Sequence, residues 1–135
     1  MTATDALIAF LRARLDEAEA VALAVPVGDI NRPPAHLDVS KHAPDGGRVL
    51  MGTGPDFEVP TPEHAAHIAA HDPAAVIADV VAKRAVIDLA DDALREQLAA
   101  GDASATGAAR MHTDVLRALA AAYMWHPDFD RAWAR

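Results

Sequence analysis

Two proline signals near the middle of the chain determine where helices can begin and end. Thr61-Pro62 places a capping residue before a proline, and proline is favoured at the first position of a helix. Asp72-Pro73 repeats this pattern. Because a residue before proline is disfavoured inside a helix, one helix has to end there and another has to begin. The sequence therefore predicts a short histidine-rich helix from about residue 61, followed at an angle by a longer helix.

The first segment, 2–25, has the apolar spacing of an amphipathic helix. Leu7, Leu11 and Leu15 recur every four residues, and Thr2 and Asp5 stand in the positions of a capping box. The charged residues between them are expected to form a solvent-exposed face; they are Arg12, Arg14, Asp16, Glu17 and Glu19.

The segment 26–60 is rich in proline and glycine and contains short alternating runs. The runs 36–40 and 48–52 are separated by Asp45-Gly46-Gly47, which is typical of a hairpin turn. A third strand is expected near 56–59. The sequence thus predicts a small antiparallel β-hairpin or a three-stranded sheet that packs against helices.

The segment 61–135 is expected to be helical. After the histidine-rich helix, a third helix runs through Val80 and Ile87 toward a stop at Gly101, and 101–107 forms a small-residue linker. A fourth helix covers about 108–124. One candidate for its inward face is the set Met111, Val115, Leu119 and Tyr123, and the other is the face of Leu116. The expected large core side chains are Leu7, Phe10, Leu11, Leu15, Ile77, Val80, Leu116, Leu119 and Trp133. We predict a single α+β, predominantly α domain over 1–135, closed by a docked C-terminal turn.

Composition and charge exclude several functional classes. The 135-residue chain has a formal net charge of −8 and no basic stripe, so no nucleic-acid partner is expected. It has no cysteine, which excludes disulfides and thiolate chemistry. No apolar run is long enough to span a membrane and the N-terminus lacks the pattern of a secretory signal, so we expect a cytoplasmic protein.

Three histidines share one side of the short helix. His67 and His71 are one turn apart, close enough to bind one ion. His67 can share an ion with either His71 or His64 but not with both, because His64 and His71 lie about 10 Å apart along the helix. His126, His112 or Asp72 would complete the ligand set. One interpretation is a zinc site, or a site for another divalent transition metal, on the 64–72 segment. The other is that the histidines bind backbone carbonyls or carboxylates, with His71 closing the helix.

Three other motifs also have alternative interpretations. His71-Asp72 is the dipeptide of metal-dependent HD phosphohydrolases, but there it lies within a helix, whereas here Pro73 ends the helix. Trp125, Phe129 and Trp133 form either a patch that recognises a partner or a set of anchors that hold the C-terminus on the core. His126-Pro127-Asp128 forms either a turn that carries ligands or a stop of the fourth helix, with Asp128 capping the next turn; we expect the stop.

Three separated motifs occur in order along the chain. They are 10–17 (Phe-Leu-Arg-Ala-Arg-Leu-Asp-Glu), 66–74 (Ala-His-Ile-Ala-Ala-His-Asp-Pro-Ala) with Lys83-Arg84, and 116–120 with Tyr123, His126-Pro127-Asp128-Phe129 and Trp133. In these motifs the chain resembles an uncharacterised family of short actinobacterial and actinophage proteins, classed as a domain of unknown function. The resemblance implies no activity or catalytic residue. Many members carry a Cys-rich insert suggestive of a metal site, but the corresponding stretch here, 91–112, has no cysteine.

We expect a small, acidic, non-enzymatic interaction or regulatory module with an unknown protein partner, a homodimer through the alanine-rich helices being one candidate. No cofactor is expected on this interpretation. The alternative is a protein that binds a divalent metal through histidines, and a more remote one is a metal-dependent hydrolase.

Overall fold

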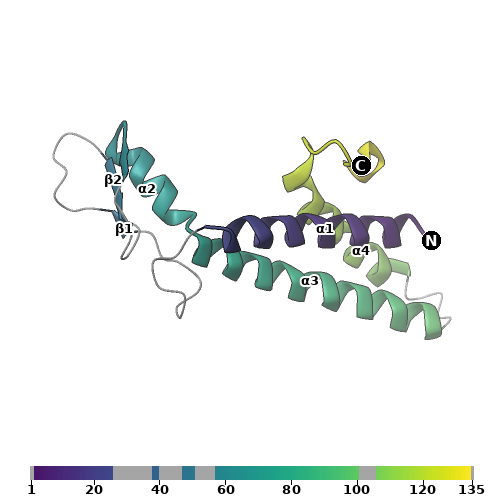
Figure 1. The fold of residues 1–135 in the computed structure, drawn as a ribbon. Helices are drawn as coiled ribbons and strands as arrows, with labels where there is room; N and C mark the ends of the chain where they lie inside the picture. The colour runs from purple at the N-terminus through teal and green to yellow at the C-terminus, as the bar shows by residue number, and fades with distance from the viewer. Residues whose placement is uncertain (1, 26–37, 40–46, 51–56, 101–105, 135) are drawn as a thin grey trace. The chain divides into compact units, whose positions relative to one another are not determined.

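The protein is predominantly helical in a computed structural model that describes residues 2–25, 38–39, 47–50, 57–100 and 106–134 (Figure 1). The described helices are α1 (Ala3–Leu23), α2 (Pro62–Ala70), α3 (Pro73–Ala100) and α4 (Thr106–Ala120). Two short 3-10 helices follow, η2 (Ala121–Tyr123) and η3 (Arg131–Ala134). None of the described helices is both long and apolar enough to cross a membrane.

The helix starts follow local capping, as predicted. At α1, the Thr2 backbone N–H donates to Asp5 Oδ2 over 2.7 Å, and the Asp5 N–H donates to Thr2 Oγ1 over 3.1 Å. Thr61 caps α2, which has a proline in its first turn. Asp72 caps α3, where its Oδ1 accepts the Ala75 N–H at 2.6 Å. The break between α2 and α3 at Asp72-Pro73 is therefore confirmed.

The chain forms two compact units, Met1–Asp16 with Val81–Arg135 and Glu17–Val80. Each is described separately, and one domain over 1–135 stays a prediction. In the first unit, the core is built by the inner faces of α1, α3 and α4. Its fully buried large side chains are Leu7, Leu11, Leu15, Ile87 and Leu116. The four-residue spacing in α1 therefore marks the buried stripe, as predicted.

The second unit contains α2 and three short antiparallel strands in the order β1-β2-β3. They are β1 (Asp38–Val39), β2 (Gly47–Leu50) and β3 (Phe57–Val59), with Val39 opposite Val49 and Val49 opposite Phe57. Helix α2 lies against β2. Most of 26–56, including Asp45 and Gly46 of the expected turn, lies outside the described residues, so the hairpin itself stays a prediction.

The structure decides between the two faces of α4 that the sequence offered as the buried one. Leu116 of α4 is fully buried, whereas Met111 and Val115 are 59% and 38% exposed. The inward face of α4 is thus the Leu116 face, and the prediction that Met111 and Val115 point inward is wrong. Ile77, Leu119 and Trp133, expected in the core, are only half-buried. The helix ends at Ala120 and continues as 3-10 turns. The linker expected at 101–107 lies largely outside the described residues.

Candidate functional site

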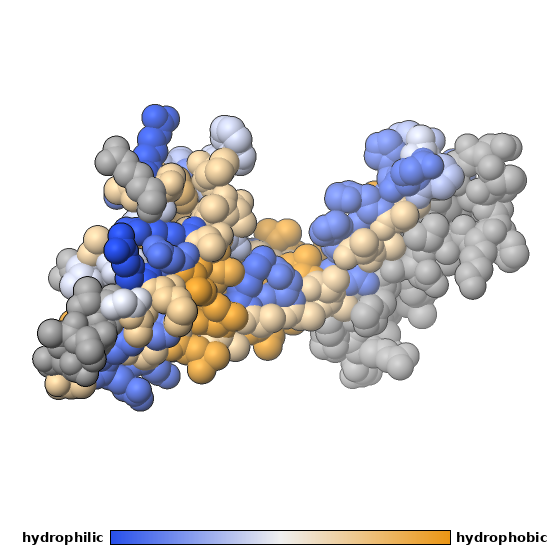
Figure 2. Space-filling model, turned by 180° about the vertical axis from the view of Figure 1, so that it is seen from behind, coloured by the Kyte–Doolittle hydropathy of each residue, from blue (hydrophilic) through white to orange (hydrophobic). Residues whose placement is uncertain are grey.

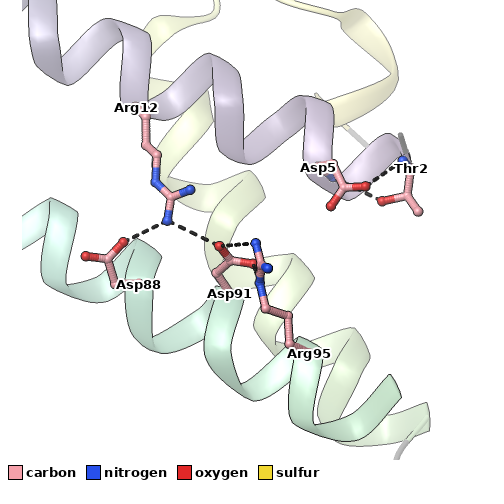
Figure 3. A network of polar contacts seen from close by, with 6 residues as sticks. All are labelled: Thr2, Asp5, Arg12, Asp88, Asp91 and Arg95. Atoms are coloured by element: carbon pink, nitrogen blue, oxygen red, sulfur yellow. Dashed lines mark hydrogen bonds and ion pairs between the residues drawn. The ribbon is translucent and has the colours of Figure 1, made fainter. Parts of the chain in front are cut away.

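A network of charged side chains joins α1 to α3 (Figure 3). Arg12 Nη2 donates to Asp88 Oδ1 over 2.8 Å and to Asp91 Oδ2 over 3.2 Å. Asp91 also accepts two hydrogen bonds from Arg95, 2.8 Å from Nε and 3.1 Å from Nη2. Asp91 is therefore held between two guanidinium groups, one from each helix.

Asp91 is the buried member of this network, and its side chain is 10% exposed. The hydrogen bond from Arg95 is the main cause that lowers the pKa of Asp91, and Arg12 lowers it further, while burial acts in the opposite direction. The bonds to Asp88 and Asp91 raise the pKa of Arg12. The carboxylate is therefore ionised at neutral pH and fully paired, which makes it a poor general base.

Sequence reasoning missed this network. Arg12 and Arg14 were both expected on a solvent-exposed face, but Arg12 forms ion pairs with α3 and Arg14 is only 8% exposed. One signal was present, because Asp91 follows the buried Ile87 by one helical turn and therefore shares its inward face. A carboxylate at such a position needs a cationic partner.

A cavity of about 480 Å³ lies beside the network. Its wall combines charged and apolar side chains. They include Asp5, Ile8, Asp91, Leu94, Arg95 and Leu98. Its volume is in the range of small-molecule pockets. The capping bonds from Thr2 lower the pKa of Asp5, so the charges on this wall persist at neutral pH.

A cluster of aromatic rings holds the C-terminal segment against α1. The ring centroid of Phe10 lies 4.9 Å from that of Trp133, 6.0 Å from Phe129 and 6.2 Å from Tyr123. Phe129 and Trp133 also pack edge to face, with centroids 5.7 Å apart. These distances and tilted or edge-on arrangements are favourable for aromatic pairs. Phe129 and Trp133 therefore act as anchors of the C-terminus, the second interpretation of the aromatic residues.

Arg14 and His126 pack against Phe10 at the edge of this aromatic cluster. The Arg14 guanidinium lies 5.3 Å above the Phe10 ring and contacts both ring nitrogens of His126, with 2.6 Å between Nη1 and Nδ1. The Asp128 N–H donates to His126 Nδ1 over 3.1 Å. The expected cap at Asp128 is instead formed by Asp130, whose Oδ1 accepts the Ala132 N–H at 2.8 Å.

Trp125 lies outside the aromatic cluster. Its side chain is 90% exposed, and the neighbouring Met124 is 50% exposed. Of the three residues predicted as an interaction patch, only Trp125 is thus fully presented to solvent, while Phe129 and Trp133 are half-buried. The recognition role of this patch stays a prediction.

The histidines of α2 bind local backbone and side-chain groups. His71 is the C-cap, and its Nδ1 lies 2.8 Å from the His67 carbonyl oxygen, so the prediction that His71 closes the helix is confirmed. His64 Nδ1 lies 2.9 Å from Thr61 Oγ1. The rings of His67 and His71 have centroids 4.4 Å apart.

Metal binding by these histidines stays a prediction. His126 belongs to the first compact unit, and His64, His67 and His71 belong to the second. Within the part of the chain that the structure describes, no group of three His, Asp or Glu side chains is arranged to hold a metal ion. The His71-Asp72 dipeptide spans the break between α2 and α3, unlike the helical dipeptide of HD phosphohydrolases.

Comparison with known proteins places the chain in a family. No curated protein and no solved structure is significantly similar to it. A model of one protein family matches residues 4–135, which includes both the charged network and the aromatic cluster. The chain therefore belongs to DUF6221, a family of unknown function.

Proposed function

We propose that this chain is a small, non-enzymatic interaction module that binds a protein partner through the surface formed by Met124 and Trp125. The observation that carries the proposal is the 90% exposure of Trp125. Trp is enriched among the residues that supply most of the binding energy at protein interfaces. A large apolar side chain in this position remains hydrated until a partner covers it.

The surroundings of Trp125 support this proposal because they hold the backbone on both sides of it. Tyr123 on one side and Phe129 on the other both pack against Phe10. The His126 N–H also donates to the Tyr123 carbonyl oxygen over 2.9 Å. A segment held on both sides loses little conformational freedom when it binds, and this favours affinity.

Hydrophobic residues reach the surface of the helices elsewhere, so the test has to separate Trp125 from other exposed apolar residues (Figure 2). Leu89 of α3 is a matched control because it is 72% exposed and does not line the cavity. Both Trp125→Ala and Leu89→Ala should melt close to the wild-type temperature. We expect a partner identified by affinity purification and then purified itself to bind the Leu89→Ala variant normally. Its Kd for the Trp125→Ala variant should rise roughly tenfold or more. Equal binding to both variants would contradict the proposal.

A second candidate function is divalent-metal binding at His67 and His71. The observation that favours it is the 4.4 Å separation of the two ring centroids on an exposed helix face. Neutral imidazole is a good ligand for zinc, nickel and copper. Elemental analysis of tag-free protein should then give about one ion per chain, as expected for a specific site. A chelator should lower the melting temperature of the wild type but not that of His67→Ala. Metal-free protein whose melting ignores the chelator would exclude this candidate.

A further inference from the structure

The outer face of α4 carries an apolar stripe that faces solvent. Met111 and Val115 lie one turn apart and are 59% and 38% exposed, although both are large apolar residues. Gly107 lies one turn before them and Ala118 about one turn after, so four small or apolar residues follow one another along the helix. The spacing of Met111, Val115 and Ala118 is that of a coiled-coil seam.

Gly107 faces open space in the described part of the chain. A Cβ atom built on it would meet nothing within 4 Å. Glycine is nevertheless among the least favourable residues in a helix, because it loses the most conformational freedom there. The advantage of a glycine on an open helix surface is that another backbone can approach closely.

Two charged residues border the stripe on one side. Arg110 and Asp114 are one turn apart, and together with the stripe they line a shallow groove on α4. Both residues are exposed. Asp114 forms an ion pair with Arg117 of the same helix, and the 3.4 Å separation of this exposed pair leaves the carboxylate accessible to a further cation.

We propose that this face of α4 binds the same face of a second copy of the chain, with the two helices antiparallel about a two-fold axis. The axis would cross the exposed face of α4 at the level of residue 113, midway between Met111 and Val115, so that Met111 of each copy packs against Val115 of the other. In an antiparallel pair the same flanks of the two helices meet. Arg110 of each copy therefore lies on the same flank as Asp114 of the other, offset by about 3 Å along the helix axis, which is within reach of the long arginine side chain. The two ion pairs are equivalent by symmetry.

Charge complementarity is the reason to choose a second copy as the occupant. One positive and one negative residue on the same flank match their own antiparallel image, whereas a parallel arrangement would bring together opposite flanks. The small residues Gly107 and Ala118 lie toward the ends of the seam, where they allow close approach on either side of the large central pair. This self-association uses a different face from the Met124 and Trp125 surface and goes beyond the proposed function.

The first experiment uses Gly107→Leu, because the open space at this position lets the folded chain accept the larger side chain. We expect the wild type to dimerise in sedimentation equilibrium over concentrations up to about 0.5 mM, where weak pairs are still detected. Gly107→Leu should be monomeric with an unchanged or higher melting temperature. The control is Ala85→Leu, which adds the same side chain at an exposed position of α3 and should leave the dimer intact.

The second experiment exchanges the charges. Arg110→Asp places two acidic residues opposite each other in both symmetry-related pairs and should weaken the dimer by roughly fivefold or more. Asp114→Arg should do the same with basic residues, and the double variant should recover much of the affinity.

Three results would each overturn the proposal: a wild type that is monomeric throughout, a dimer that tolerates Gly107→Leu, or a double variant no better than the single ones. Loss of binding by Trp125→Ala together with an intact dimer would separate this inference from the proposed function.

Discussion

Replacement of Asp91 by Asn tests whether the charged network stabilises the fold. The substitution keeps the shape of the side chain and removes its negative charge. The carboxylate accepts three hydrogen bonds from guanidinium groups, at 3.2 Å from Arg12 and at 2.8 and 3.1 Å from Arg95. The amide of the variant has a single acceptor oxygen, and its NH₂ group cannot accept a hydrogen bond, so the guanidinium groups lose part of their pairing.

The loss of stability in Asp91→Asn depends on how well water can hydrate the guanidinium groups of Arg12 and Arg95. A hydrogen bond to a buried charged group contributes about 1.5–3 kcal/mol, but the side chains of Arg12 and Arg95 are 44% and 69% exposed and can be rehydrated. We therefore expect Asp91→Asn to lower the free energy of unfolding by about 1–2 kcal/mol at pH 7, well below the sum of three buried bonds.

The effect should also depend on pH. The pKa of Asp91 is lower in the folded state than the ordinary value, mainly because of its hydrogen bond to Arg95. The stabilisation is therefore fully present above the unfolded-state pKa of about 3.9 and is lost as the pH falls through the lower folded-state pKa. The difference in stability between wild type and variant should be constant from neutral pH to about pH 5 and shrink below about pH 4.

The assay is urea unfolding followed by circular dichroism at about pH 7, 5, 4 and 3. Asp16→Asn is the control, because Asp16 is 69% exposed and pairs with Arg84 across the same two helices at 2.6 Å, so loss of its charge should cost about 0.5 kcal/mol or less. The reasoning would be refuted if Asp91→Asn were as stable as wild type at neutral pH. It would also be refuted if the difference persisted undiminished at the lowest pH.

Three further substitutions test the packing. Leu116→Ala should lower the free energy of unfolding by about 2–5 kcal/mol because Leu116 is fully buried. Met111→Ala, measured in protein dilute enough to be monomeric, should cost about 0.5 kcal/mol or less; equal losses in chemical denaturation would contradict the assigned inner face of α4. Asp72→Ala should cost about 1 kcal/mol through loss of the α3 cap, and an unchanged melting temperature would speak against that role. Trp133→Ala should cost about 2 kcal/mol and release the C-terminal segment to limited proteolysis, since its ring packs on Phe10 and Phe129, while Trp125→Ala should do neither.

The starts of α1, α2 and α3 were predictable because they depend on nearby residues, whereas α4, expected to run to about 124, ends at Ala120. The caps at Thr2, Thr61 and Asp72 act on backbone N–H groups within three residues, and a proline acts on the residue directly before it. The four-residue spacing of leucines in α1 likewise identified the buried stripe, because that pattern has one interpretation in a helix.

The candidate site was less predictable. The aromatic residues at the C-terminus were identified, but two interpretations remained open until Phe129 and Trp133 were found on Phe10. The charged network was missed, because Arg12 lies in a sequence that reads as a solvent-exposed face. Its partners Asp88 and Asp91 are distant in the chain, so no local pattern connects them.

The sequence by itself determined the helical class, the starts of α1, α2 and α3 and the break at Asp72-Pro73, because capping and proline geometry act over a few residues. The tertiary structure decided which of two apolar faces of α4 is buried. Met111 with Val115 and Leu116 with Ala120 both have helical spacing, and only contact with α1 and α3 distinguishes them. It also decided that Arg12 and Arg14 point to partners, because burial and pairing of charge depend on residues brought together from opposite ends of the chain.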